Sequence, residues 1–441
     1  MRFRTVDLAA AVGGTLHGGD VEVTGATTDS RAVASGALFV PIVAERDGHD
    51  FVAAAVAAGA GAVLTARAVP PDLGVPAIAV ADTGAALLDV GRLARRRLRT
   101  LVVGITGSVG KTSVKDLAAA ALATRFPTAA SERSFNNELG VPLTLANAPD
   151  GTRATVVEMG ARGVGHVALL CDVAHPTVGV VTRVAAVHTE AFGSIEAVAR
   201  SKGELIEALP AAGTAVLNAD DWRVAAMATR TPARVLAYSA VGAPGADVVA
   251  TAVVLDDELR PRFRLVSPWG EAAVALAVRG EHQVGNALAA AAAALACGCT
   301  PDEVAGGLAA AQLSPWRMEL GRTPAGALVL NDAYNANPTS MAAALHALAA
   351  LPARRRVAVL GVMAELGPSA AADHDAVAGL ARQLGVAVVA VGTDAYGVAP
   401  VDGVDAVVAA LGTLGDGDAV LVKASRVAGL EHVAAALLAG G

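Results

Sequence analysis

The segment from Leu101 to Ser113 reads LVVGITGSVGKTS: an apolar, β-branched strand, a glycine-containing turn, and Lys-Thr-Ser at the start of an alanine-rich helix. This order predicts a phosphate-binding loop, because the backbone N–H groups of such a turn point toward a polyphosphate. We expect Lys111 to reach the β and γ oxygens and the Thr112 hydroxyl to ligate Mg²⁺. Ile105 stands where the strict motif has glycine, but the strand and helix supply the required context. The chain is therefore expected to bind ATP or GTP through Thr106, Gly107, Ser108, Val109, Gly110, Lys111, Thr112 and Ser113.

Lysine is rare in this chain. Lys and Arg together number 34, yet the only lysines are Lys111, Lys115, Lys202 and Lys423. Because this chain otherwise uses arginine as its cation, each lysine is a candidate for chemistry that needs a primary amine or a compact charge. This makes Lys202 and Lys423 functional candidates. Lys115, one helical turn after Lys111, is expected on an exposed helix face.

Polar residues follow several of the predicted strands. Ligands of open parallel sheets bind beyond the carboxyl ends of the strands, so these residues are candidates for a site. Glu158 ends the strand ATVVEMG and is expected to hold Mg²⁺; the alternative is a carboxylate that caps the next turn. His188 follows the strand TVGVVTRV, and alone it fits a structural or solvated histidine equally well. Asn136 and Asn137 can orient a polar substrate, although their spacing alone favours local backbone hydrogen bonds.

Two further segments suggest contacts from the last third of the chain. The stretch from Asn331 to Pro338 reads NDAYNANP directly after an apolar strand, which is typical of a ligand-facing loop. Arg317, in the linker SPWRME, could reach a phosphate from the far side of an interdomain cleft; the alternative is a surface arginine.

The length of 441 residues and the alternation of strands and helices predict three α/β domains. Residues 1–99 form a small N-terminal α/β domain. Residues 100–313 form a central domain with a parallel sheet around the phosphate loop, as in P-loop ATPases. Residues 314–441 form a doubly wound, Rossmann-like domain that lacks a glycine fingerprint of its own and is expected to bind a substrate.

Composition excludes several classes of protein. The mean hydropathy of +0.52 comes from alanine and valine, and no uncharged stretch is long enough for a membrane span. Asp7 interrupts what would be the apolar core of a signal peptide, so a cytoplasmic location is expected. The net charge of −7 argues against nucleic acid or an anionic membrane as a partner. The three cysteines are expected to be free thiols. The arginines from Arg92 to Arg99 are expected on a solvated helix face.

Several motifs occur in register over nearly the whole chain, and together they resemble the Mur ligases of peptidoglycan synthesis. The motifs are TTDSR, TGSVGKTS, SFNNELGVPLTL, VVEMGA, AAVHTEAFGSIEAVARSKGEL, GEHQVGNALAA, LNDAYNANPTSM, GVMAELG and VKASR. The similarity is greatest to the branch that joins D-alanyl-D-alanine to a UDP-N-acetylmuramoyl tripeptide. It implies an ATP-dependent amide ligase that forms an acyl phosphate, uses two Mg²⁺ ions and acts as a monomer.

The resemblance also implies residue roles. Lys111 and Thr112 would hold the ATP phosphates and a first Mg²⁺, while Glu158 and His188 would serve a second. Lys202 would be carbamylated on its amine and help to place that metal. Asn286 would contact adenine, Arg317 and Asp332 would clamp the nucleotide, and Ser30 and Arg31 would contact the uridine diphosphate. The remaining expected substrate contacts are Asn136, Asn137, Tyr334, Asn335 and Asn337.

Two residues depart from the family pattern. Val362 stands where relatives usually have Asp, and Ala424 where they have Gly; both lie in the third domain, at the dipeptide end of the site.

The sequence argues against several other functions. A GTP-binding switch lacks support because no N-K-x-D motif is present. The ligase that adds a single amino acid would carry D-N-P-R in its third domain. Folylpolyglutamate synthetases begin near the phosphate loop, whereas this chain has a domain before that loop. A nucleotide-hydrolysing motor would also lack this preceding domain. A scaffold protein without catalytic activity would not need Lys202. The third residue of the peptide, diaminopimelate or lysine, stays open.

Overall fold

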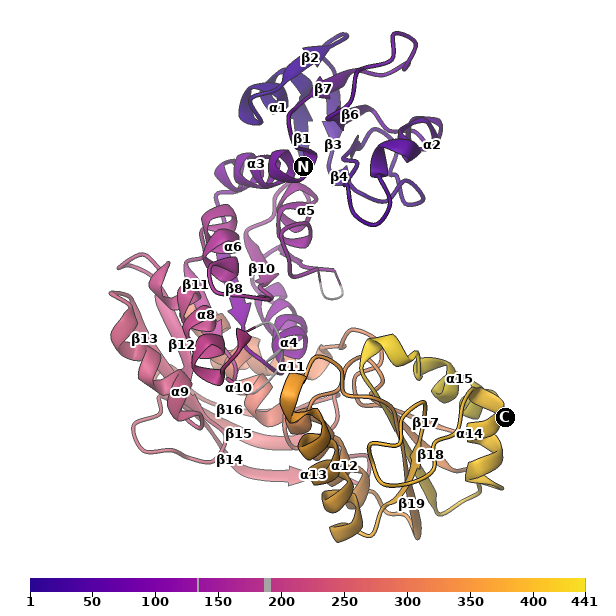
Figure 1. The fold of residues 1–441 in the computed structure, drawn as a ribbon. Helices are drawn as coiled ribbons and strands as arrows, with labels where there is room; N and C mark the ends of the chain where they lie inside the picture. Colours follow the sequence, from indigo (N-terminus) through magenta and orange to yellow (C-terminus); the bar gives the residue numbers. More distant parts are fainter. Residues whose placement is uncertain (133–134, 186–191, 441) are drawn as a thin grey trace.

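The computed structural model describes residues 1–132, 135–185 and 192–440. Three sheet-containing regions follow one another along the chain (Figure 1). The N-terminal region lies at one end of the molecule, and the C-terminal region, in orange and yellow, lies at the other (Figure 1). The central region joins them.

The N-terminal region has a five-stranded sheet and a short antiparallel pair. Its sheet has the order β2-β7-β6-β5-β4, and β1 pairs with β3. Strands β4 to β7 run parallel, and β2 is antiparallel to β7. The elements are β1 (Arg2–Arg4), α1 (Thr5–Ala11), β2 (Thr15–His17), β3 (Glu22–Thr24), β4 (Ala26–Thr27), β5 (Leu38–Phe39), η1 (Gly48–Phe51), α2 (Val52–Ala57), β6 (Ala62–Thr65) and β7 (Ala77–Ala79).

Helix α3 (Thr83–Arg97) connects this region to the central one. Asp82 caps its first turn by accepting from the N–H groups of Gly84 and Ala85. Its apolar face, including Leu87 and Val90, lies in the same core as residues of the central helices. The N-terminal region therefore shares a hydrophobic core with the central region through α3.

The prediction of a solvated arginine face on α3 was partly wrong. Arg92 donates to Asp172 at 2.8 Å, and Arg95 donates to the carbonyl of Ala174 at 2.7 Å. Arg97 donates to Asp7 at 2.6 Å. These contacts join α3 to α6 (His166–Ala174) and α1, so three of the arginines also connect neighbouring elements. Arg96, Arg97 and Arg99 are exposed as expected, and Arg99 lies beyond the end of α3.

The central region is built on a nine-stranded sheet with the order β16-β15-β14-β13-β12-β11-β8-β10-β9. Strands β8 to β14 are parallel, and β14, β15 and β16 form antiparallel pairs. The elements are β8 (Leu101–Thr106), α4 (Lys111–Ala123), β9 (Thr128–Ala130), α5 (Gly140–Ala146), β10 (Ala154–Glu158), α6 (His166–Ala174), β11 (Val178–Val181), α8 (Ile195–Glu207), β12 (Thr214–Asn218), α9 (Trp222–Ala225), η2 (Ala226–Arg230), β13 (Arg234–Ser239), β14 (Val248–Leu255), β15 (Pro261–Ser267), β16 (Gly270–Ala275), α10 (Gln283–Ala296) and α11 (Pro301–Ala310).

Strand β8 is covered on both faces. Val103 and Ile105 pack with α4 and α10, whereas Val102 faces the core that includes α3. Alternate residues of a strand point to opposite faces, so an apolar run is expected where both faces are buried. This burial fixes the strand that ends at the phosphate loop.

The C-terminal region has a five-stranded sheet of order β17-β18-β21-β19-β20, parallel except for the edge strand β17. Leu328, Leu330 and Leu360 pack with α12 and α13, whereas Val329 and Val359 pack with α14 and α15. The sheet is therefore doubly wound, as predicted. The elements are β17 (Glu319–Arg322), β18 (Leu328–Asn331), α12 (Pro338–Ala350), β19 (Arg355–Leu360), η3 (Gly367–Ser369), α13 (Ala370–Gln383), β20 (Ala387–Ala390), α14 (Val404–Leu411), β21 (Asp418–Lys423), η4 (Arg426–Ala428) and α15 (Glu431–Ala439).

Lys115 was predicted to be exposed, and this was wrong. Its side chain is buried, and its ammonium donates to the carbonyl of Ser131 at 2.7 Å and pairs with Asp116 at 2.8 Å. The helix turns this residue toward β9 and away from solvent. The cysteines are free, with Cys171 and Cys299 buried and Cys297 half-buried. In the described ranges, no helix has the length and apolar character to span a bilayer.

Candidate active site

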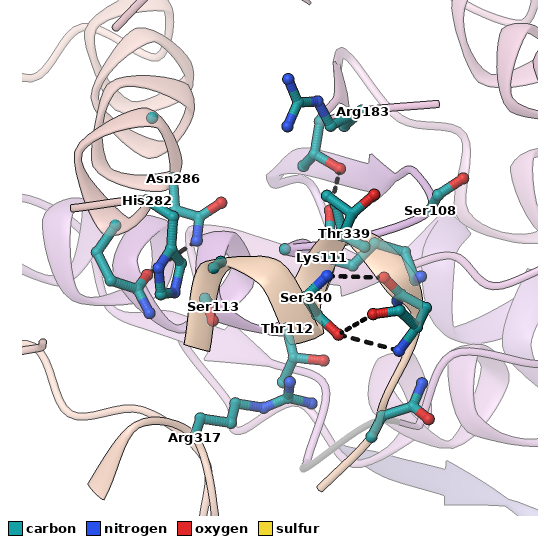
Figure 2. Close-up of a pocket in the computed structure, with 18 of the residues that line it drawn as sticks. Ser108, Lys111, Thr112, Ser113, Arg183, His282, Asn286, Arg317, Thr339 and Ser340 are labelled. Atoms are coloured by element: carbon teal, nitrogen blue, oxygen red, sulfur yellow. Dashed lines mark hydrogen bonds between the residues drawn. The ribbon is translucent and has the colours of Figure 1, made fainter. Parts of the chain in front are cut away.

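A cavity of about 1140 Å³ lies between the central and C-terminal regions. Its central wall is formed by the segments that follow β8, β10 and β11 and by the start of α10. Its other wall comes from the linker at Arg317, the loop after β18, and α12. Figure 2 shows ten of these residues, from both walls, labelled around the phosphate loop.

Two glycines allow the phosphate loop to adopt its shape. Gly107 has φ = 145° and Gly110 has φ = 83°, both in the region that favours glycine. A Cβ at Gly107 would lie 2.0 Å from Thr182 Oγ1, and one at Gly110 would lie 2.5 Å from Asn286 Oδ1. The loop therefore lies directly against β11 and α10. Lys111 is half-buried, its ammonium donates to the Gly107 carbonyl at 2.9 Å, and burial lowers its pKa.

Glu158 lies at the end of β10, beside the first turn of α4. It is 1% exposed, and it accepts from Thr112 Oγ1 at 2.7 Å and from Asn136 Nδ2 at 2.8 Å. Both partners are neutral, and within the described ranges no cation lies within ion-pair distance of this carboxylate. A buried carboxylate without a cationic partner is costly, so the site favours an added cation. Asn136 thus orients the acid.

Lys202 lies on α8, and its side chain lines the same cavity as Lys111 and Glu158. It is 2% exposed, and its ammonium lies 5.7 Å from the centre of the Phe192 ring. Burial, and next the charge of Lys111, lower the pKa of Lys202 to about 7. Close to neutral pH, a large fraction of this amine is therefore unprotonated and nucleophilic.

The C-terminal wall presents a cation supported by an aromatic ring. The Arg317 guanidinium stacks 4.0 Å from the Tyr334 ring, and its Nε has no hydrogen-bond partner. Asp332 Oδ2 pairs with Lys423 at 2.5 Å, and Asp332 Oδ1 accepts from the N–H of Met318 at 3.2 Å. Lys423 also donates to the Asn335 carbonyl at 2.7 Å, so it holds the loop that carries these residues.

The polar loop predicted from NDAYNANP does line the cavity, but part of it serves the backbone. Asn337 caps α12 by accepting from the N–H of Ser340 at 2.9 Å. Asn335 Oδ1 accepts from the adjacent Ala336 N–H. Likewise, Asn137 Oδ1 accepts from the N–H groups of Leu139 and Gly140 at the start of α5.

Other predicted residues lie elsewhere. Ser30 and Arg31 belong to the N-terminal region and do not line the cavity; Arg31 is exposed and pairs with Asp29 at 2.8 Å. His188 lies outside the described residues. Ala424 is buried between strands of the C-terminal region, and the Val362 carbonyl accepts from the Ser425 N–H at 2.9 Å.

The structure brings the predicted nucleotide and metal residues that it describes into one cavity. Of the predicted loop residues, Thr106 and Gly107 do not line it; the Thr106 hydroxyl instead donates to the Met159 carbonyl at 2.7 Å. The sequence analysis missed many residues that line the cavity, among them His282, Arg183 and Arg162. His282 belongs to the motif GEHQVGN, which was the available signal, and Arg183 lies two residues after β11. No group of three or more His, Cys, Asp or Glu side chains in the described residues could hold a metal unaided.

Comparisons with known proteins agree with this geometry. Residues 105–294 match the Mur ligase middle domain, and residues 316–426 match the family model described as Mur ligase, glutamate ligase domain. The UDP-N-acetylmuramoyl-tripeptide–D-alanyl-D-alanine ligase of Mycobacterium tuberculosis is 44% identical over 93% of this chain and 91% of its own length. The chain belongs to the Mur ligase family.

Solved structures support the same placement. The UDP-N-acetylmuramoylalanyl-D-glutamyl-2,6-diaminopimelate–D-alanyl-D-alanyl ligase of Acinetobacter baumannii superposes with a TM-score of 0.85 at 29% identity, covering 99% of this chain and 98% of its own. MurF of Thermotoga maritima, solved with ADP, gives a TM-score of 0.81 at 26% identity, covering 94% and 97%. The predicted three-domain α/β architecture is thus the Mur ligase fold, and the family places this chain among ATP-dependent ligases.

Proposed function

We propose that this Mur ligase joins D-alanyl-D-alanine to the terminal carboxylate of a UDP-N-acetylmuramoyl tripeptide, with release of ADP and phosphate. The observation that carries the proposal is the single cavity in which the phosphate loop, Glu158, Lys202 and Arg317 meet. Similarity to ligases of this name over most of the chain selects the substrates. Because ATP and UDP-linked precursors are cytoplasmic, we place the reaction there, in a monomer.

The nucleotide is assigned to the cavity between α4, α10 and the C-terminal loop. Residues 106–113 hold its phosphates, with Lys111 turning from the Gly107 carbonyl toward the β and γ oxygens. Asn286, directly beside Gly110, contacts adenine. Arg317 and Asp332 close on the nucleotide from the C-terminal region, where Arg317 has a free Nε.

The residues present fit Mg²⁺. Glu158 and the Thr112 hydroxyl supply adjacent hard oxygen donors, and the carboxylate has only neutral partners. His188 and a carbamylated Lys202 would complete a second site. When bound, these ions neutralise charge on the transferring phosphoryl group.

A carbamate on Lys202 fits the surroundings of its amine. Carbon dioxide adds to an unprotonated amine, and burial lowers the pKa of Lys202 to about 7. The product is an anion that relieves the repulsion from Lys111. Arginine cannot carry this group, which accounts for lysine at this position in an arginine-rich chain.

The reaction follows from what an amide bond requires. A carboxylate is a poor electrophile, so one of its oxygens attacks the γ phosphorus of ATP and ADP leaves, giving an acyl phosphate. The free amine of D-alanyl-D-alanine then attacks the acyl carbon, and phosphate leaves with the bridging oxygen. Lys111 and Arg317 bind the developing phosphate charge, and closure of the domains excludes water that would hydrolyse the intermediate.

The test is product analysis with a choice of amines. The enzyme is incubated with ATP, Mg²⁺ and the tripeptide nucleotide, with D-alanyl-D-alanine, diaminopimelate or lysine added separately, and products are weighed by mass spectrometry. We expect a product with the dipeptide alone. A product with a single amino acid and none with the dipeptide would assign the chain to the paralogous ligase.

A further inference from the structure

The segment between β10 and α6 lines the cavity but has no role in the reaction described above. It contributes Arg162, and the first residue of α6, His166, lines the cavity beside it; the nucleotide, the metal and the reacting carboxylate require neither side chain. Both side chains are exposed to the cavity or to solvent. Arg162 therefore presents a positive charge at the cavity that the reaction steps do not use.

The segment is held at several points, so Arg162 is presented from a defined backbone. The Gly160 N–H donates to the Asn136 carbonyl at 2.7 Å, and a Cβ at Gly160 would lie 2.7 Å from Asn136 Oδ1. Ser201 Oγ donates to the Gly163 carbonyl at 3.0 Å. The Arg162 N–H donates to His166 Nδ1 at 3.2 Å.

The segment also packs against the part of α8 that carries Lys202. Glu204, two residues after Lys202, accepts from the N–H of Gly165 at 2.6 Å and from the N–H of Ala168 at 2.9 Å. Ser201, the residue before Lys202, makes the bond to Gly163. Arg162 is therefore on the Lys202 side of the cavity, where the acceptor must place its carboxylate.

An anion in this part of the cavity would be bound by side chains and not by the N-terminal end of α6. Glu204 already occupies N–H groups at the start of α6. The Arg162 guanidinium, in contrast, makes no ion pair or hydrogen bond with any residue in the described ranges. Because His166 Nδ1 accepts, the ring proton is on Nε2, which is a second donor beside it.

We propose that Arg162, assisted by His166, binds a carboxylate of the acceptor peptide other than the one that is phosphorylated. This inference rests on the proposed function. A guanidinium binds a carboxylate through two parallel hydrogen bonds, so the contact fixes orientation as well as charge. Arg162 would thereby be a specificity-determining residue for the peptide.

The acceptor offers two carboxylates of this kind. One is the side-chain carboxylate of diaminopimelate at the third position, which lysine lacks. The other is the glutamyl carboxylate that is not used in the peptide bond, which an amidated peptide lacks. The experiment separates the two sources.

Steady-state kinetics are measured with three acceptors: a diaminopimelate tripeptide nucleotide, its lysine counterpart, and the diaminopimelate compound with the glutamyl carboxylate amidated. The enzymes are the wild type, Arg162→Gln, Arg162→Lys and the control Arg96→Gln, an exposed arginine on α3. Circular dichroism and the KM for ATP report whether each variant is folded. Product formation by the wild type tests the proposed function separately.

For Arg162→Gln we expect a loss of about 10- to 100-fold in kcat/KM, as for removal of a charge-assisted hydrogen bond, confined to acceptors that carry the recognised carboxylate. A loss with both diaminopimelate acceptors that spares the lysine acceptor identifies the side-chain carboxylate. A loss with both non-amidated acceptors that spares the amidated one identifies the glutamyl carboxylate. Arg162→Lys should recover part of the loss. Equal changes with all three acceptors, or none beyond those of Arg96→Gln, would overturn the proposal.

Discussion

At the scale of single residues, the four lysines show which sequence inferences the structure supports. Lys111 and Lys202 line one cavity, as their assigned roles require, and Lys423 holds the loop that carries Asp332. Lys115 was misjudged because helical spacing from Lys111 does not say which face is buried. Its ammonium instead satisfies a buried carbonyl.

The modification of Lys202 depends on pH in a defined direction. Burial lowers the pKa of the amine to about 7, so the fraction able to react with carbon dioxide rises as the pH increases through 7. In carbon-13 bicarbonate, the NMR signal of a carbamate should therefore grow between about pH 6 and pH 8 and be absent from Lys202→Gln. Lys202→Arg should lose ligase activity by several orders of magnitude. An active wild-type enzyme with no carbamate signal would contradict this role.

At the scale of elements, the site is made by loops that leave one edge of a parallel sheet. β8, β10 and β11 end at the phosphate loop, at Glu158 and before Thr182, respectively. The linker that carries Arg317 is also constrained. Trp316 and Met318, on either side of it, have φ values of 62° and 53°, and Asp116 of α4 accepts from the Ser314 N–H at 2.7 Å. The linker is thus tied to the helix that begins at the phosphate loop.

The departure at Ala424 is accommodated by Gly361, the residue that directly follows the neighbouring strand β19. A Cβ at Gly361 would lie 2.8 Å from the Ala424 Cβ, closer than two methyl groups can approach. Gly361→Ala should therefore lower the free energy of unfolding by about 1–3 kcal/mol through overpacking. In the Ala424→Gly variant, Gly361→Ala should lower the free energy of unfolding by clearly less. Urea unfolding of the two single variants and the double variant measures the coupling, and additive effects would show that the two positions do not compete for space.

The sequence predicted the elements with strong local signals. The phosphate loop, the valine-rich strands and the doubly wound C-terminal sheet are present because apolar runs and glycine turns are local properties. The analysis missed β1, α1, β2, β9 and β17, which are short or pair at a sheet edge, and also β13, a six-residue strand inside the nine-stranded sheet. It could not foresee that Asn136 orients Glu158, or that Glu204 holds the segment carrying Arg162, since these contacts join residues 22 and 36 or more positions apart.

At the scale of the whole molecule, three regions must bring separate ligands to one place. The N-terminal region is packed through α3, and the C-terminal region forms one wall of the cavity. The domain boundaries near residues 99 and 313 stay predictions. We propose that the uridine nucleotide binds to the N-terminal region and ATP to the cavity between the central and C-terminal regions.

That separation predicts the effect of Arg31→Ala. Arg31 is exposed, and within the described ranges its one ion pair is with Asp29. It also lies outside the cavity, so its loss should not affect the binding of ATP. We expect the KM for the UDP-linked tripeptide to rise by about tenfold or more, with the KM for ATP within twofold of the wild type. Arg96→Ala serves as a matched control. A change in the KM for ATP, with no change in the KM for the UDP-linked tripeptide, would contradict binding of the uridine nucleotide to the N-terminal region.

The central claim is that the acceptor carboxylate is phosphorylated by ATP in the cavity between Lys111, Glu158 and Lys202. The most direct measurement uses a tripeptide nucleotide labelled with oxygen-18 in its terminal carboxylate, together with ATP, Mg²⁺ and D-alanyl-D-alanine. One labelled oxygen should appear in the inorganic phosphate, in step with the formation of ADP and the amide. Unlabelled phosphate, or the formation of AMP and pyrophosphate, would contradict the account.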